Sequence, residues 1–131
     1  MIFAAALVAA GAHAAEVLSG PYPAEVLRVI DGDTFVARVR IWLGQDVIAT
    51  IRLRGIDAAE LRGPCAAAAQ AARDHLAHLL GGGPAVLTQV SHDKYGGRYD
   101  ARAALPDGTD LAEAMHNAGH ARRWSGRREG C

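Results

Sequence analysis

The chain has 131 residues, 50% of them hydrophobic, with fourteen basic and fourteen acidic side chains. That length predicts one domain with a single core. The charge balance argues against a passive nucleic-acid coat, whose affinity comes from many phosphate contacts, but it does not exclude an enzyme that must release its product.

Residues 1–14 have the pattern of a secretory signal peptide. An apolar run from Ile2 to Ala10 precedes Ala12-His13-Ala14, a small-x-small cleavage site, and the run is too short to span a bilayer. We therefore expect cleavage after Ala14 and a periplasmic or secreted domain over residues 15–131, without stable membrane association or an obligate protein partner. The alternative is an untranslocated apolar N-terminus, since no Lys or Arg precedes the run.

The first half of the mature chain has the pattern of a β-sheet. β-Branched residues dominate from Glu25 to Ile56 and alternate with charged ones, which predicts three strands, with a hairpin turn at residues 43–46 between the second and the third. Two more strands are expected at about 85–90 and 98–105.

Two helices are expected in the second half. Pro64 opens an alanine-rich helix that should end at Leu80, before the glycines 81–83, and a second helix is expected over residues 110–117. The core face of the first comprises Ala69, Ala72, Leu76, Leu79 and Leu80. Five strands with a helix between the third and fourth predict a mainly β, α+β fold: a five-stranded OB-fold barrel with two to three helices.

Asp31-Gly32-Asp33-Thr34 lies between the first two predicted strands. Asp-Gly is common in tight hairpins, so one interpretation is a simple turn. The other is a metal site. An EF-hand is excluded, because the further acidic positions and the glycine of that loop are absent.

The segment from Arg52 to Glu60 adds two arginines, Arg52 and Arg54, and two carboxylates at the end of the third strand. Asp57 can meet Asp33 if the two strand ends are neighbours, and oxygen-only ligands favour calcium, magnesium or manganese over zinc or copper. Arg52 can clamp a phosphate and Glu60 can take a proton from an attacking water. The alternative for these two residues is a surface ion pair, usually worth less than about 1 kcal/mol.

A third motif, DKYGGR at residues 93–98, lies between the fourth and fifth strands. Lys94 adds charge, Tyr95 can stack on a base or bond a phosphate, and Arg98 can offer a second guanidinium to the transition state. The alternative is an ordinary Gly-Gly hairpin with a solvated arginine. Together the three motifs predict a metal-assisted phosphodiesterase.

The cysteines and tryptophans leave alternatives open. In an oxidising compartment Cys65 and Cys131 are most simply a disulfide, which would stabilise the fold by roughly 4 kcal/mol in the chain-entropy model, but they can also be two unrelated thiols. Trp42 is expected to pack in the barrel or its turn. Trp124, in the basic C-terminal tail, is expected either to stack on a nucleotide or to cover the second helix.

The three motifs, in this order and spacing, resemble the thermonuclease family (staphylococcal-nuclease-like domains) from about Val26 to Trp124. The resemblance implies a calcium-dependent OB-fold endonuclease that cleaves DNA and RNA, prefers single strands and leaves 3′-phosphates. By position it implies calcium ligands at Asp33, Asp57 and the Ala58 carbonyl, catalytic roles for Arg52, Glu60 and a loop arginine, for which Arg98 is the candidate, and phosphate contacts from Lys94 and Tyr95.

The chain departs from the family pattern at two places. Ala58-Ala59 replaces a Thr-Pro pair, and Gly97 stands where the loop arginine is expected. Because a one-residue slip reverses side-chain direction in a strand, Arg98 can act only if a bulge absorbs the extra glycine. The resemblance also implies a Cys65–Cys131 disulfide, as in the exported bacterial branch of the family.

The hypothesis is therefore an exported calcium-dependent nuclease. Its rival is an OB-fold nucleic-acid-binding module that keeps the groove but has weak or lost catalysis. A structural or partner-binding domain fits the neutral charge, but it leaves the carboxylates unexplained.

Overall fold

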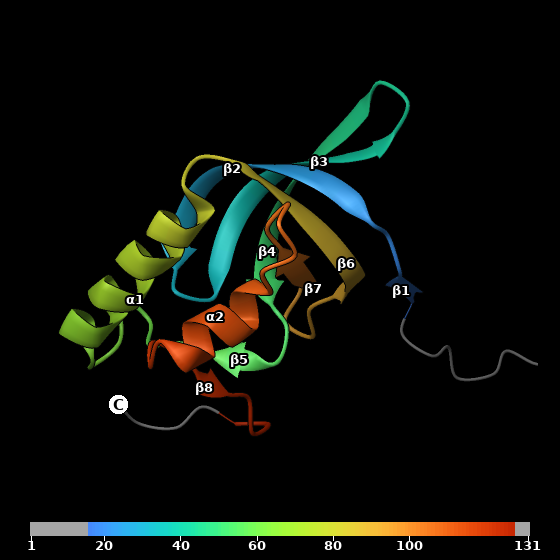
Figure 1. The fold of residues 1–131 in the computed structure, drawn as a ribbon. Coiled ribbons are helices and arrows are strands. Elements are labelled where there is room, and N and C mark those ends of the chain that lie inside the picture. Colours follow the sequence, from blue (N-terminus) through green and yellow to red (C-terminus); the bar gives the residue numbers. More distant parts are fainter. Residues whose placement is uncertain (1–15, 128–131) are drawn as a thin grey trace, which may run out of the picture.

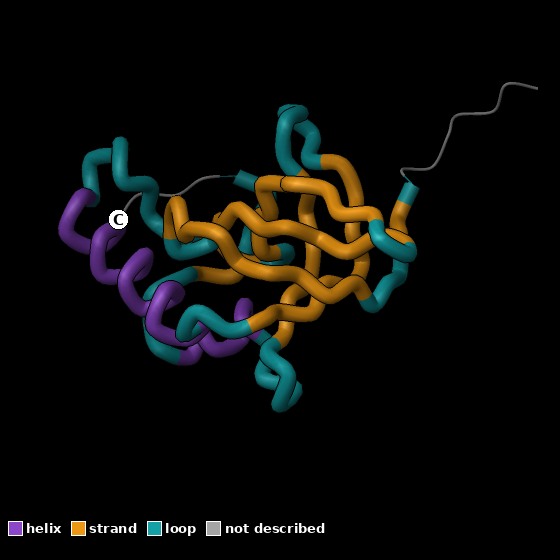
Figure 2. Tube along the Cα trace, turned by 90° about the horizontal axis from the view of Figure 1, so that it is seen from above, coloured by secondary structure: helices purple, strands orange, loops and turns teal. Residues whose placement is uncertain are grey.

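A closed β-barrel carries two helices on one side (Figures 1 and 2). The computed structural model describes residues 16–127. In this range about 45% of the residues are in strands and 20% in helices, which confirms the predicted OB-like α+β fold with five barrel strands and two helices. The barrel strands are β2 (Tyr22–Asp31), β3 (Thr34–Trp42), β4 (Gln45–Leu53), β6 (Pro84–His92) and β7 (Tyr99–Ala104).

The barrel closes in the order β6-β2-β3-β4-β7, with β7 pairing back onto β6. All neighbours are antiparallel except β4 and β7, which run parallel with Ile51 opposite Tyr99. A parallel pair needs a long crossover, and helix α1 with strand β6 supplies it. A short strand, β1 (Val17–Leu18), lies outside the barrel along β6.

Helix α1 (Ala66–Leu80) follows the predicted pattern closely. It begins just after Pro64 and ends where Gly81 adopts a left-handed conformation, a common way for a helix to stop. Of the predicted core face, Ala69, Ala72, Leu76 and Leu80 are buried, and Leu79 is partly buried against the same core. Helix α1 thereby covers one end of the barrel core.

Helix α2 (Leu111–Asn117) lies within the predicted range and has Asp110 as its N-cap. The Asp110 side chain accepts a hydrogen bond from the Glu113 N–H at 3.0 Å, which satisfies one of the unpaired donors of the first turn. Leu111 and Met115 of this helix are fully buried in the same core as Leu76. Both helices therefore pack on the barrel rather than extend from it.

A second, two-stranded sheet was not predicted. Strand β5 (Ile56–Asp57) pairs with β8 (Arg122–Arg123), which belongs to the segment interpreted as a polar tail. The Trp124 N–H also donates to the Gly55 carbonyl at 2.9 Å. The described part of this tail is therefore held against the end of β4 and β5, next to the second motif.

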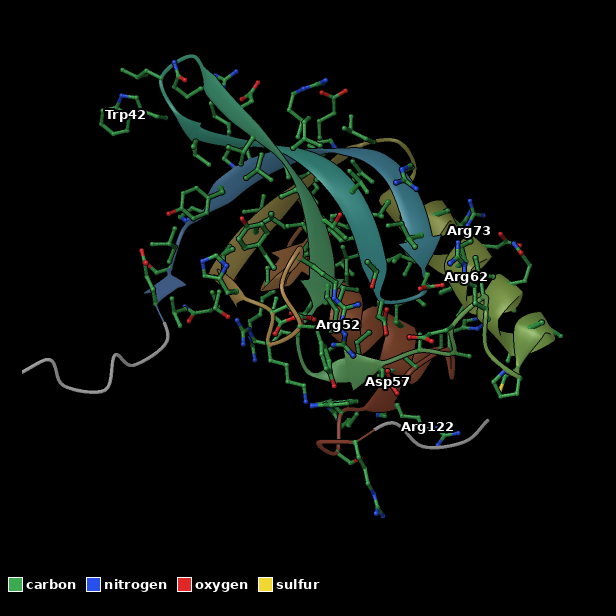
Figure 3. All side chains as sticks on the ribbon, turned by 180° about the vertical axis from the view of Figure 1, so that it is seen from behind. Trp42, Arg52, Asp57, Arg62, Arg73 and Arg122 are labelled. Carbon is green, nitrogen blue, oxygen red and sulfur yellow. The ribbon has the colours of Figure 1, made fainter. Side chains whose placement is uncertain are left out.

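The β3–β4 hairpin extends beyond the barrel (Figures 1 and 3). Its turn falls at Leu43-Gly44, as predicted, but the expectation that Trp42 packs in the barrel or its turn is wrong. Trp42 is 70% exposed and Leu43 is 84% exposed. The tip of the hairpin, with Trp42 and Leu43, therefore lies outside the barrel.

Two predictions, export and the disulfide, depend on residues that the structure does not describe. The signal peptide at residues 1–14 lies outside the described range, and so does Cys131, so export and the Cys65–Cys131 disulfide stay predictions. Across residues 16–127, no helix combines the length and apolar character needed to span a bilayer.

Candidate active site

The DGDT turn is pressed against helix α1. Asp31 and Thr34 face each other across the hairpin between β2 and β3. A Cβ placed on the buried Gly32 would lie 2.6 Å from the Ala72 Cβ and 3.1 Å from the Ala58 Cβ. Only glycine allows this approach, which holds the turn beside the residues that follow β5.

Asp33 is a buried carboxylate that accepts two hydrogen bonds. Its side chain is 7% exposed; Oδ1 accepts from the Thr34 hydroxyl at 2.8 Å, and Oδ2 accepts from the Ala58 N–H at 2.9 Å. The second bond joins the first motif to the second motif. Another bond of the same kind runs from the Leu61 N–H to Asp31 Oδ1 at 3.2 Å, and it fixes the turn that carries Glu60.

Arg52 brings the two predicted metal-binding carboxylates together. It lies on β4 directly opposite Thr34. One nitrogen, Nη2, is 3.4 Å from Asp57 Oδ1 and 3.8 Å from Asp33 Oδ2, and Nη1 donates to the Leu53 carbonyl at 3.2 Å. The guanidinium is almost buried, so its charge acts on both acids with little screening. Asp33, Asp57 and Arg52 thus converge, as the motif spacing predicted.

The two predicted metal-binding carboxylates, Asp33 and Asp57, are of the donor type that a hard cation takes. Within the described residues no group of three or more His, Cys, Asp or Glu side chains is arranged to hold a metal. One oxygen of each carboxylate nevertheless lies within 3.8 Å of the same atom, the Arg52 Nη2. Such a pair suits calcium if a backbone carbonyl and water complete the coordination. Ala58, the predicted carbonyl ligand, is buried beside them.

Glu60 shares a cavity with Asp57. The cavity has a volume of about 450 Å³ and lies between the turn after β5, the start of α1 and the segment before β8. Its polar lining comprises Asp57, Glu60, Cys65, His120 and Arg122. The turn is closed by the Gly63 N–H, which donates to the Glu60 carbonyl at 3.0 Å. Glu60 is exposed, so water can reach its side chain.

The DKYGGR loop is organised around Asp93 rather than around the Arg52 site. Asp93 is buried; Oδ1 accepts from the Tyr95 N–H at 2.8 Å, and Oδ2 accepts from Arg98 Nε at 3.0 Å. Gly96 and Gly97 both adopt positive φ, 75° and 73°. The extra glycine is therefore absorbed in the loop, not in a strand bulge, and Arg98 forms an ion pair with Asp93.

Two carboxyl groups behind this loop have opposite pKa shifts. Burial would raise the pKa of Asp93, but the Tyr95 N–H and the Arg98 guanidinium outweigh it and lower that pKa. The pKa of Asp100 is raised, first by burial and then by the negative charge of Asp93. Asp93 therefore carries the charge that Arg98 neutralises, while Asp100 holds its proton more tightly than a solvated aspartate.

Lys94 and Tyr95 are exposed beside the site, and Trp124 connects them to it. The Lys94 Nζ lies 4.9 Å from the centre of the Tyr95 ring and 5.8 Å from that of Trp124. On the other side, the Arg52 guanidinium lies 5.4 Å from the same Trp124 ring. Cation–π contacts of this kind hold the positive groups next to one another. Trp124 therefore lies against the site, within cation–π distance of both Arg52 and Lys94.

The comparisons with known proteins add no identification. No protein-family model matches the chain, and a search of curated proteins finds no match.

Proposed function

We propose that this chain is a calcium-dependent phosphodiester hydrolase, an endonuclease that acts on DNA and RNA with a preference for single strands. The observation that carries the proposal is the position of Arg52 Nη2 between Asp33 Oδ2 and Asp57 Oδ1. Calcium, the single-strand preference and 3′-phosphate products come from the resemblance to the thermonuclease family. Export to the periplasm or medium belongs to the same proposal.

Each residue would have a defined task. Asp33, Asp57 and the Ala58 carbonyl would hold calcium, which supplies Lewis acidity and a template for the phosphate. Glu60 would accept the proton of the attacking water, and Arg52 would bind the phosphate oxygens as negative charge builds up. Lys94 and Tyr95 would contact a phosphate at the rim.

The rival is a nucleic-acid-binding module without turnover. A buried Asp33 and a nearly buried Asp57 beside the phosphate-binding arginine argue against it, because two negative groups there repel a polyanion. A cation between them and the phosphate removes that repulsion. The arrangement is therefore better suited to metal-assisted hydrolysis than to simple binding.

The test is cleavage of denatured DNA by the full chain with calcium or with a chelator. We expect cleavage with calcium only, and a loss of about 10²- to 10⁴-fold in kcat for Glu60→Gln, because the proton acceptor is removed. Glu25→Gln is the control: this carboxylate is exposed on β2 and pairs with Arg38 at 2.9 Å, away from the cavity. Binding without any calcium-dependent cleavage would favour the module instead.

A further inference from the structure

The Arg98 guanidinium is engaged by a buried acid. It is 3.0 Å from Asp93 Oδ2, and only 4% of the Asp93 side chain is exposed. Turning Arg98 toward Arg52 would leave that carboxylate buried without its cation, which is strongly unfavourable. Arg98 is therefore poorly suited to supply the second guanidinium of the site.

Strand β8 brings another arginine to the candidate site. Arg122 lies directly opposite Asp57 in the antiparallel β5–β8 pair (Figure 1). Residues directly opposite each other in such a pair project from the same face, with Cβ atoms about 4.5–5.5 Å apart. Arg122 also lines the 450 Å³ cavity together with Asp57 and Glu60. In the view of Figure 3, Asp57 lies between Arg52 and Arg122.

The next residue, Arg123, has a different partner. It is opposite the buried Ile56, and its Nη1 and Nη2 atoms lie 3.0 Å and 3.3 Å from the two Glu113 carboxylate oxygens of α2. Successive side chains of a strand point to opposite faces. The alternation thus directs Arg123 to helix α2 and Arg122 to the cavity.

We propose that Arg122 is the second guanidinium of the site and binds a phosphate oxygen of the nucleic-acid strand in the cavity beside Asp57 and Glu60. This inference rests on the proposed nuclease function. A planar guanidinium can give a phosphate two parallel hydrogen bonds. At this position the positive charge of Arg122 also offsets the repulsion between the nucleic-acid strand and the carboxylates of Asp33 and Asp57.

The first experiment compares Arg122→Ala with Arg123→Ala in cleavage of single-stranded DNA with calcium. We expect Arg122→Ala to lower kcat by about 10²- to 10³-fold, as loss of one transition-state donor does, and Arg122→Lys to restore part of it. Arg123→Ala should stay within about twofold of the unsubstituted chain, because the residue faces α2. Thermal unfolding midpoints verify that each variant is folded.

The second experiment measures binding of a short single-stranded DNA with calcium, in the Glu60→Gln background that prevents cleavage. Arg122→Ala should weaken binding and reduce the salt dependence by about one phosphate contact, whereas Arg123→Ala should not. Unchanged binding and turnover in Arg122→Ala would overturn the inference, and so would a loss of turnover confined to Arg98→Ala. Binding that depends on Arg122 without any cleavage by the unsubstituted chain would overturn the nuclease proposal and leave the phosphate contact standing.

Discussion

Asp33 is oriented by donors from two distant parts of the sequence. Its neighbour Thr34 donates to one carboxylate oxygen and the Ala58 N–H to the other. Under the calcium proposal, these bonds would fix the carboxylate before a cation arrives, so little ordering entropy would remain to be lost on binding. The arrangement depends on how closely the DGDT turn approaches α1.

Gly32→Ala tests that approach. The new Cβ would meet the Ala72 Cβ at 2.6 Å and the Ala72 backbone carbon at 3.1 Å, and neither can rotate away. We expect the free energy of unfolding in urea to fall by about 1–3 kcal/mol, as for other overpacked sites. Gly83→Ala is the control, because its Cβ would meet only the Leu80 carbonyl oxygen, at an ordinary 3.6 Å. Equal unfolding midpoints for the two variants would contradict the close packing.

Asp100→Asn tests the carboxyl pair behind the DKYGGR loop. Burial and the Asp93 charge raise the Asp100 pKa above its ordinary 3.8, so the stability that a protonated Asp100 contributes is complete below 3.8. It is lost as pH rises through the folded-state pKa. Asp100→Asn should therefore raise the free energy of unfolding more at about pH 7 than at about pH 4.

Asp107→Asn is the matched control, and its expected effect on stability at neutral pH has the opposite sign. The Thr109 N–H lowers the pKa of the exposed Asp107, so that carboxylate contributes stability above its ordinary pKa and loses it as pH falls. Asp107→Asn should thus lower stability at about pH 7 and have less effect in acid. If urea titrations show Asp100→Asn to be the less stable chain at neutral pH, Asp100 is not destabilised by its charge.

At the scale of elements, the β3–β4 hairpin has a packed half and an exposed tip. Trp42→Ser should change the free energy of unfolding by less than about 0.5 kcal/mol, since the ring contributes little to the core. Phe35→Ala, on the same strand but fully buried, should cost about 3–5 kcal/mol. Chemical denaturation measures both. A large loss for Trp42→Ser would mean that the tip is packed in solution.

Elements specified by local sequence were predictable, and those specified by distant pairing were not. The end of α1 at Gly81 and the Asp110 cap depend on neighbouring residues, so the sequence indicates them. Strands β5 and β8 have two residues each and exist only because they meet. For the same reason the sequence alone indicates only that Arg122 belongs to a basic tail. Trp42 was misplaced because alternation does not tell where a hairpin leaves the barrel.

The candidate site was predictable in part. The convergence of Asp33, Asp57 and Arg52 followed from the motifs at the ends of neighbouring strands, and the structure brings them together. The position of Arg98 was not predictable, because it depends on the conformation of Gly97 in the loop and on the burial of Asp93. Neither can be obtained from residue order alone.

At the scale of the whole molecule, charged groups are clustered although the chain as a whole is neutral. Acidic and basic residues are equal in number, yet Arg52, Lys94 and Trp124 form one cluster of cation–π contacts beside the carboxylates. Under the nuclease proposal, association with nucleic acid should therefore depend on this local field rather than on net charge.

The pairing of β5 with β8 also sets an order of events during synthesis. Residues 56–57 are synthesised before residues 122–123, so a nascent chain has Asp33 and Asp57 before the segment that carries Arg122 and Trp124 exists. Under the nuclease proposal, the growing chain would not have a complete site until β8 has been made and has paired with β5.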